Sequence, residues 1–320
     1  MFNYKVFIIG SLSLWLLLSS TIQAKPLSIA LVLWNGETSA EQSFKSELEQ
    51  LGYQVTYKQI NAEQSKKTLV LSVYDNLMPE IKQYDYIYTF GTTVSMLMKN
   101  LLQEQVPQIF NIVVAPVEAK LVENLQKTGG NISGASPSID LDLQLNNARK
   151  LFEFKKLGLF FNPRDRNSLI IRKKLQKIAV KQGFKIIDLS LPPDTEQLDK
   201  YVQAIKNNEL QLDAVYLPMD TFISMQAKEI ADAMHSLNVK TIGANLLQLK
   251  QGILVGTIAD YAEMGRAAAQ VVYQHQQNGT FENIPVQLPQ QPRFIINKRI
   301  AKQLKVMIPV VIQKYKELIN

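Results

Sequence analysis

Short apolar segments of the kind that form buried β-strands alternate with helical patterns along nearly the whole 320-residue chain. Residues 27–33 (LSIALVL) are apolar at every position but one, and residues 41–51 place Phe44, Leu48 and Leu51 at helical spacing. Strands that are apolar on both faces, each followed by a helix, indicate parallel sheets covered by helices on both sides. About ten such strands are too many for one sheet of an ordinary domain, so we predict two α/β lobes. The predicted strands are 27–33, 53–57, 84–90, 108–114, 131–135, 157–161, 184–189, 214–217, 240–243 and 253–258, and the predicted helices include 41–51, 168–182, 221–237 and 261–277.

A weak internal repeat also favours two similar lobes. The segment Asp85-Tyr86-Ile87-Tyr88 leads into Gly91-Thr92-Thr93, and Asp213-Ala214-Val215-Tyr216 leads into Met219-Asp220-Thr221. Each is a strand, a short polar loop and the start of a helix. The repeat places polar loops at the carboxyl ends of strands, where open parallel sheets bind ligands.

The first 24 residues have the pattern of a secretory signal peptide. Lys5 is the single charge in residues 1–23, residues 6–18 are almost wholly apolar, and Ala24 is a small residue at the expected cleavage site. The alternative is an uncleaved membrane anchor, but the apolar run is shorter than the ~20 residues that span a bilayer. The chain has no cysteine, so there is no disulfide and no lipid-attachment site at the junction. We therefore expect a periplasmic protein that is not a lipoprotein.

The basic residues do not form a nucleic-acid site. The net charge is +7, and the densest cluster, around Arg172, Lys173 and Lys174, falls on a predicted helix whose other face is apolar. This pattern is typical of a solvated helix face.

No constellation of catalytic residues is present. The two histidines, His235 and His275, fall on predicted helices, where a surface or packing role is the default. No nucleophile–base order, glycine-rich phosphate loop or metal-ligand spacing occurs. Asp220 and Asp260 could act as an acid–base pair, but pairing with a charged ligand is the simpler interpretation. We predict a protein that is not an enzyme and has no cofactor and no metal.

Several strand-end loops carry groups that suit a small ligand. Gly91, Thr92 and Thr93 begin a helix, whose free N–H groups and hydroxyls suit a carboxylate, although Thr92 or Thr93 could simply cap the helix. Asn167 or Ser168 can likewise cap the helix after residues 157–161, and Asp220 can cap a helix or hold a cation. A core position is the alternative for Trp34. The other candidates at strand ends are Trp34, Asn35, Asn162, Asn167, Ser168, Asp220, Asp260 and Tyr261.

In this order and spacing the chain resembles the ABC-transporter substrate-binding proteins of the tryptophan/tyrosine-transport type, over essentially all of the chain after the signal peptide. Each motif is short, and their joint order is what makes the resemblance specific. The motifs are Gly91-Thr92, Pro116-Val117, Gly129-Gly130-Asn131-Ile132-Ser133-Gly134, Asn162-Pro163 with Asn167-Ser168, Pro218-Met219-Asp220, Asp260-Tyr261 with Gly265, Ile296-Asn297 with Ala301, and Ile308-Pro309.

The resemblance implies a type I periplasmic-binding-protein fold, in which two Rossmann-like lobes are joined by a three-crossover hinge. It places crossovers near Ser138, Tyr261 and Pro285, and hence an N-terminal lobe of 25–138 plus 261–285 and a C-terminal lobe of 139–260 plus 286–320.

The resemblance also implies roles for the candidate residues. Thr92 and Thr93 would hold a ligand carboxylate, and Trp34 and Tyr261 would pack on the ligand's body. Pro116 belongs to the expected ligand-binding segment, and Ala115 stands where the family usually has an aspartate, which removes a charge near the expected cleft. From the other lobe the ligand would meet Asn162, Ser168, Asp220 and Asp260.

The predicted function is capture of an amino acid or similar carboxylate between the lobes, for delivery to an inner-membrane ABC permease by a monomeric protein. The alternative is a sensory protein that reports the ligand to a membrane kinase or cyclase, and a periplasmic enzyme is a third, weaker hypothesis. Neighbouring reading frames for a permease and an ATPase, or for a membrane sensor, would separate the first two.

Overall fold

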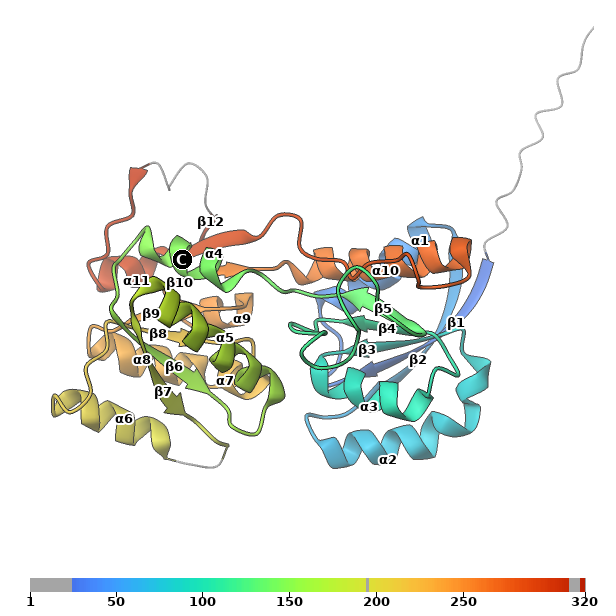
Figure 1. The fold of residues 1–320 in the computed structure, drawn as a ribbon, viewed down its shortest axis with the longest axis horizontal. Coiled ribbons are helices and arrows are strands. Elements are labelled where there is room, and N and C mark those ends of the chain that lie inside the picture. The colour runs from blue at the N-terminus through green and yellow to red at the C-terminus, as the bar shows by residue number, and fades with distance from the viewer. Residues whose placement is uncertain (1–24, 194–195, 311–316, 320) are drawn as a thin grey trace, which may run out of the picture.

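The computed structural model describes residues 25–193, 196–310 and 317–319, which form two α/β lobes side by side (Figure 1). The predicted signal peptide, residues 1–24, lies outside the described residues. The first lobe contains β1 (Lys25–Leu33), α1 (Ser39–Gln50), β2 (Tyr53–Asn61), α2 (Lys66–Asn76), the 3-10 helix η1 (Met78–Gln83), β3 (Tyr86–Phe90), α3 (Thr92–Leu102), β4 (Gln108–Asn111), β5 (Ile132–Ala135) and α10 (Tyr261–Asn278). The second contains α4 (Leu141–Arg149), β6 (Lys156–Phe161), α5 (Arg166–Gln182), β7 (Lys185–Ser190), α6 (Gln197–Lys206), β8 (Ala214–Leu217), α7 (Thr221–Met225), α8 (Ala227–Ser236), β9 (Lys240–Gly243), α9 (Leu246–Lys250), β10 (Val255–Ile258), β11 (Arg293–Asn297), α11 (Lys298–Gln303) and β12 (Glu317–Ile319).

The five strands of the first sheet and the strands β6 to β10 of the second follow the same connection order, and the two helix-covered sheets confirm the predicted α/β fold. The first has the order β2-β1-β3-β4-β5 with all pairs parallel, and the second has the order β12-β11-β10-β9-β8-β6-β7. In both, the first strand lies next to one edge of the sheet, the second strand forms that edge, and the chain then crosses back to the other side of the first strand, so that loops after neighbouring strands converge at the carboxyl ends. The sequence repeat reflects this equivalence. Asp85 accepts a hydrogen bond from the backbone N–H of Ser28 (2.7 Å) in β1, and Asp213 accepts one from the backbone N–H of Lys156 (2.8 Å) at the start of β6.

Strand β11 departs from the parallel arrangement, because it pairs antiparallel with β10, with Ile258 opposite Arg293. The chain enters β11 from the first lobe, at the end of the sheet where β10 finishes. A strand that starts at that edge must run in the opposite direction to β10.

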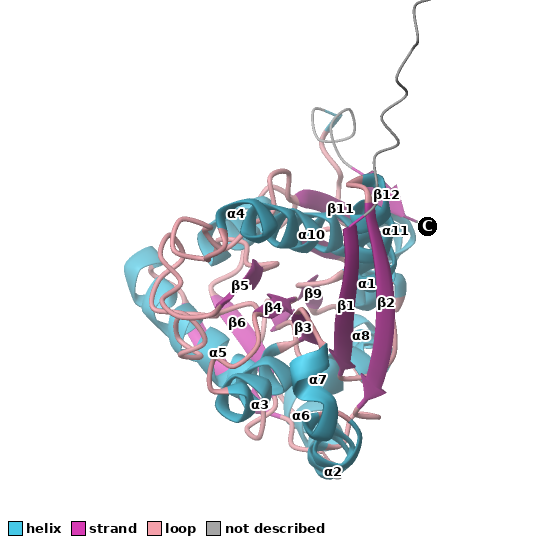
Figure 2. Ribbon diagram, turned by 90° about the vertical axis from the view of Figure 1, so that its right-hand side faces the viewer, coloured by secondary structure: helices cyan, strands magenta, loops and turns pink. Residues whose placement is uncertain are grey.

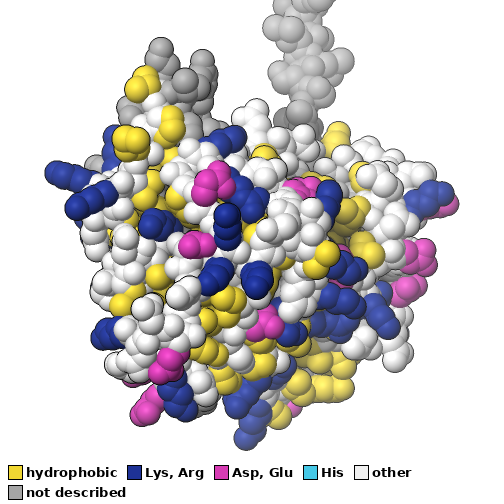
Figure 3. Space-filling model, turned by 60° about the vertical axis from the view of Figure 1, so that its left-hand side comes forward, with side chains coloured by type: hydrophobic (Ala, Val, Ile, Leu, Met, Phe, Trp, Pro, Cys, Tyr) yellow, Lys and Arg dark blue, Asp and Glu magenta, His cyan; other side chains and the backbone are white. Residues whose placement is uncertain are grey.

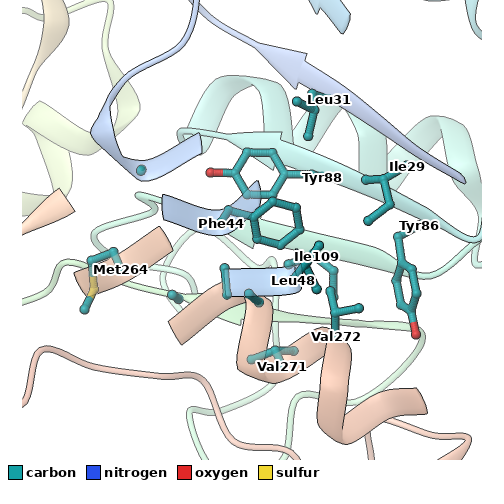
Figure 4. Packing of buried hydrophobic residues seen from close by; sticks show 14 of the residues in the cluster. Ile29, Leu31, Phe44, Leu48, Tyr86, Tyr88, Ile109, Met264, Val271 and Val272 are labelled. Carbon is teal, nitrogen blue, oxygen red and sulfur yellow. The ribbon is translucent and has the colours of Figure 1, made fainter. Parts of the chain in front are cut away.

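Each sheet is covered on both faces, as the apolar strands require (Figures 1 and 2). In the first lobe α1 and α10 pack on one face, while α2 and α3 pack on the other. Figure 4 shows the first of these layers, where the ring of Phe44 lies 4.7 Å from that of Tyr88 and Val271 and Val272 approach from α10. In the second lobe α4, α5 and α11 cover one face, and α6, α7, α8 and α9 cover the other.

Within the described residues the chain passes between the lobes at three places: between β5 and α4, between β10 and α10, and between α10 and β11. Two of these segments are joined by backbone hydrogen bonds, from Ser136 N–H to the carbonyl of Gln287 (2.8 Å) and from Gln287 N–H to that of Gly134 (2.9 Å). A narrow connection of this kind permits hinge motion.

The largest differences from the predicted elements concern one strand and one helix. The predicted strand 108–114 ends at Asn111, because Ile112 takes a left-handed backbone conformation (φ 55°) that no strand accommodates. The predicted helix 221–237 is divided at Gln226 into α7 and α8. The apolar positions keep helical spacing across the division, so periodicity alone does not reveal it.

The surface agrees with the dispersed basic residues of the sequence, since Lys and Arg side chains in Figure 3 are spread over the face shown and interleaved with acidic and apolar ones. Among the described residues no helix is both long and apolar enough to cross a membrane.

Candidate ligand-binding site

A cavity of about 930 Å³ lies between the lobes, at the carboxyl ends of the strands of both sheets. Its volume falls in the range of small-molecule sites. The first lobe contributes the loops after β1, β3 and β4, and the second contributes those after β6, β8, β9 and β10. The loops at the carboxyl ends of the strands therefore meet in one crevice, as the topology predicts.

The start of α3 presents hydrogen-bond donors to the cavity. Gly91 is the N-cap residue, with φ 83°, and has no side chain to bond the first-turn N–H groups, while Thr92 and Thr93 line the cavity. The alternative that Thr92 or Thr93 caps α3 is thus wrong, because both are already inside the helix. Unsatisfied N–H groups and the positive end of the helix dipole favour an anion at this point.

The opposite wall carries acceptors and carboxyl groups. Asp220 caps α7 by accepting from Ile223 N–H (2.8 Å) and also accepts from the hydroxyl of Ser168 (3.0 Å). Burial, and secondarily the negative charge of Asp165, raise the pKa of the Asp220 carboxyl to about 7. Asp165, and neither of the predicted residues Asn167 and Ser168, caps α5, through a hydrogen bond from Ser168 N–H (2.8 Å). An aspartate before the helix competes better for this position because its short carboxylate reaches the N3 amide.

Asn167 contributes an acceptor to the same wall. Its Nδ2 donates to the carbonyl of Met219 (2.6 Å), whereas its buried Oδ1 has no hydrogen-bond partner. Asn162 also lines the cavity and directs its Oδ1 to the N–H of Arg164 (2.9 Å), which shapes the turn after β6.

Asp260 is neutralised within the protein. It caps α10 by accepting from Ala262 N–H (2.8 Å), and its other oxygen forms an ion pair with Arg293 (3.1 Å) at the start of β11. Both residues line the cavity where two crossing segments meet. The pair fastens these segments together, so Asp260 presents less negative charge to a ligand than its sequence position suggests.

Aromatic and sulfur-containing side chains form the apolar walls. Trp34 lines the cavity half-buried, next to the exposed Asn35. Tyr261 packs edge-on against Phe90, with ring centroids 6.2 Å apart, and its hydroxyl lies 3.7 Å from the sulfur of Met219. Met219 contacts the cores of both lobes, so this part of the wall bridges them. Such walls suit a flat apolar group.

Ten of the twelve predicted site residues line the cavity, and two do not. Ser168 lies directly behind the wall and acts on it through Asp220. Pro116 is buried in a turn, where its carbonyl accepts from the N–H groups of Leu121 (2.8 Å) and Val122 (3.3 Å). Ala115 is likewise buried and outside the lining, so the missing aspartate does not remove a charge from the cavity surface of this structure.

Several lining residues were not singled out from the sequence. Met219 lies within the quoted motif Pro218-Met219-Asp220 and Phe90 lies next to Gly91-Thr92, so both could have been found there. Arg293 lies 33 residues beyond its partner Asp260 and carries no local signal. Other lining residues outside the prediction include Thr38, Gln64, Ser224, Asn245 and Lys250.

The histidines take packing roles away from the cavity. His235 bonds Thr241 (2.9 Å), and burial lowers its pKa to about 4. His275 bonds the hydroxyl of Tyr86 (2.7 Å) and packs on Phe281. Among the described residues no group of three His, Cys, Asp or Glu side chains could hold a metal ion.

Comparison with known proteins identifies the family. Residues 29–318 match the family model described as ABC transporter substrate binding protein, so the chain belongs to this family of non-catalytic binding proteins. The chain is 27% identical over 221 residues to a tyrosine-binding protein of Clostridioides difficile (strain R20291), an alignment that covers 69% of this chain and 63% of that relative.

Solved structures share the fold. The chain is similar to an ABC domain in complex with L-Trp from Streptococcus pneumonia (TM-score 0.78, 19% identity, covering 92% of this chain and 100% of that one). It is also similar to a conserved domain protein from Vibrio cholerae (TM-score 0.79, 19% identity, covering 91% and 99%). The fold is that of the periplasmic binding proteins.

Proposed function

We propose that this substrate-binding protein captures a free α-amino acid, with aromatic amino acids as the preferred class, and presents it to an ABC permease. The observation that carries the proposal is the division of charge across the cavity. The first lobe offers the N–H groups of α3 to a carboxylate, and the second offers Asp165 and Asp220 to an ammonium group. An amino acid has these two groups on one carbon atom and would therefore bridge the lobes.

The aromatic preference rests on the walls between the two charged ends. Trp34, Phe90 and Tyr261 line the cavity and provide flat apolar surface for a ring. The relatives described as a tyrosine-binding protein and as a complex with L-Trp support the same class of ligand.

The proposed mechanism is closure of two lobes around the ligand. The lobes would comprise 25–138 plus 261–285 and 139–260 plus 286–320, turning about the three crossing segments. Contacts to both lobes exist together only when the cleft is closed, so an amino acid bound at both ends shifts the population toward closure. A permease would recognise the closed form of the monomer, in the periplasm, after removal of residues 1–24. The sensory role stays an alternative prediction.

Thermal unfolding with a panel of amino acids tests the proposal. The chain from residue 25 onward, stripped of any co-purified ligand by unfolding and refolding, is melted with each of the twenty amino acids and with sugars as controls. A ligand at about 100-fold excess over its dissociation constant stabilises the folded state by roughly 2.7 kcal/mol. We expect the largest rise in melting temperature with L-tyrosine or L-tryptophan. A rise with sugars alone would contradict the proposal.

A further inference from the structure

Two carboxyl groups stand together in the second-lobe wall without a cation. Asp165 and Asp220 both line the cavity, and within the described part of the chain neither forms an ion pair with a lysine or arginine. Asp220 is only 4% exposed. Its oxygens accept from Ile223 N–H and from the Ser168 hydroxyl, both neutral donors. Such hydrogen bonds favour the ionised form but leave a second negative charge beside Asp165 uncompensated.

One residue, Ser168, brings the two carboxyl groups together, because its backbone N–H donates to Asp165 (2.8 Å) and its hydroxyl donates to Asp220 (3.0 Å). Burial and the charge of Asp165 together raise the pKa of Asp220 to about 7, against the opposing effect of its two hydrogen bonds. Like charges this close in a buried site do not both ionise until a cation joins them.

A third polar group marks this place as the position of a ligand's donor. Asn167 is 6% exposed, lines the same wall, and has a buried Oδ1 without a partner. A buried acceptor without a partner destabilises the folded state, because it has lost its hydrogen bonds to water and gained none in return. An ammonium group, which has three donors, can serve Asn167 and both aspartates at once.

The other charged groups around the cavity do not take this role. Asp260 and Arg293 are paired with each other at 3.1 Å, and Lys250 is exposed on α9. Arg164 and Arg166 flank Asp165 on the outer side of the turn, and both are exposed. Arg166 donates across the lobes to the carbonyl of Glu118 (3.2 Å).

We propose that the ammonium group of the ligand takes the place of the proton held between Asp165 and Asp220, so that capture of an amino acid near neutral pH releases a proton. This inference rests on the proposed function. Before binding, the pair carries one carboxylic acid and one carboxylate, and the ligand carries –NH3⁺. After binding, two carboxylates face the same –NH3⁺ and one H⁺ has passed to solvent, so charge and atoms balance. Capture then becomes tighter as pH rises, and amine-free analogues gain nothing from the same rise.

Calorimetric titration in two buffers measures the exchange. L-tyrosine and L-tryptophan are titrated into the stripped protein in phosphate and in a buffer of high ionisation enthalpy, at several pH values. From the position of the Asp220 titration we expect close to one proton released at pH 6, about half at pH 7 and almost none above pH 8. The association constant should rise by up to about tenfold per pH unit below pH 7. The analogue 3-(4-hydroxyphenyl)propionate, which has no amino group, should bind without releasing a proton.

A matched pair of variants assigns the proton. Asp220→Asn keeps an oxygen to accept from Ile223 N–H and so preserves the cap of α7, but it has no proton to exchange. We expect it to bind L-tyrosine more weakly, with no proton release and a flat pH profile. Asp199→Asn, at an exposed position on α6, should behave like the parent protein.

The outcomes separate this inference from the proposed function. Binding of an amino acid with equal heats in both buffers at pH 6 and 7 would overturn the exchange and leave amino-acid capture intact. Proton release that persists in Asp220→Asn would also overturn it. If no α-amino acid binds at all, the exchange and the proposed function fail together.

Discussion

Gly265 sets how closely α10 approaches α1, and replacing it by alanine tests the packing that positions one wall of the cavity. A Cβ atom at Gly265 would lie 2.0 Å from the carbonyl oxygen of Ala40 and 3.0 Å from the backbone nitrogen of Phe44. Because the obstacle is backbone, no side-chain rotation relieves it, and α10 must move away from α1. Overpacking of this kind costs about 1–3 kcal/mol. The 2.0 Å contact with backbone corresponds to the upper end of this range, about 3 kcal/mol, and alanine gains about 1 kcal/mol over glycine inside a helix, so the expected net loss is roughly 2 kcal/mol.

The loss is measured as the shift of the urea unfolding midpoint of Gly265→Ala relative to the parent. Arg266→Ala, the exposed neighbouring position, is the control and should change stability by less than about 0.5 kcal/mol. Because Tyr261 begins the same helix one turn earlier, Gly265→Ala should also weaken ligand binding. An alanine variant as stable as the parent, or stabilised by the full helix-propensity gain, would refute the close approach of the two helices.

Three further predictions concern charge and closure. The pKa of Asp220 in the folded protein is raised above that of an unfolded aspartate, so its contribution to stability is present below about pH 4 and is lost as pH rises through about 7. The parent protein should therefore lose roughly 2–4 kcal/mol of stability between pH 4 and pH 8, and Asp220→Asn should not show this decline. Melting temperatures over this pH range measure it, and an equal decline in the parent and in Asp220→Asn would contradict the assignment. Lys174 and Glu118 form an ion pair between the lobes, and the hydrogen bond from Lys174 holds the pKa of Glu118 below its usual value. Because a solvent-exposed pair contributes little, Lys174→Ala should weaken ligand affinity by no more than about fivefold. A hundredfold loss of affinity would show a larger role for this pair. In a chain from residue 25 onward Trp34 is the sole tryptophan, so its emission should shift saturably with ligand, and a silent Trp34 in a protein that gains thermal stability from the same ligand would place it outside the contact.

The strands were predictable because their apolar character is continuous and their ends are sharp. The predicted strands 214–217 and 240–243 coincide with β8, whose four residues are all buried, and with β9, of which Thr241, Ile242 and Gly243 are buried. β11 was not predicted, although residues 294–297 are buried, because its direction and position depend on the chain returning from the other lobe. Local patterns do not carry that information.

The candidate site was predictable to the extent that topology determines it. Residues after the carboxyl ends of parallel strands converge whatever their side chains, and this rule places Trp34, Thr92, Asp220 and Tyr261 in one cavity. The rule does not distinguish a residue that faces the cavity from one behind it, as Ser168 and Asp220 illustrate.

Pairing across long sequence distances was also invisible from the sequence. Asp260 was a candidate ligand-binding residue because it is charged and follows a predicted strand. Its charge is compensated by Arg293, which lies on another segment that crosses between the lobes. The sequence also does not show which of several neighbouring residues caps a helix. Asp165, Asn167 and Ser168 all suit a helix start, and in the structure Asp165 is the residue in the N-cap position of α5.

The most direct test of amino-acid capture is a calorimetric comparison of L-tyrosine and L-tryptophan with analogues that lack either the carboxylate or the amino group. The cavity divides its charge recognition between two lobes, so we predict one-to-one binding of at least one of the two amino acids and a loss of at least about tenfold in affinity for each of its analogues, tyramine or tryptamine on the one side and the deaminated acids on the other. Equal affinity for an amino acid and for both of its analogues, or binding of neither amino acid, would contradict the account.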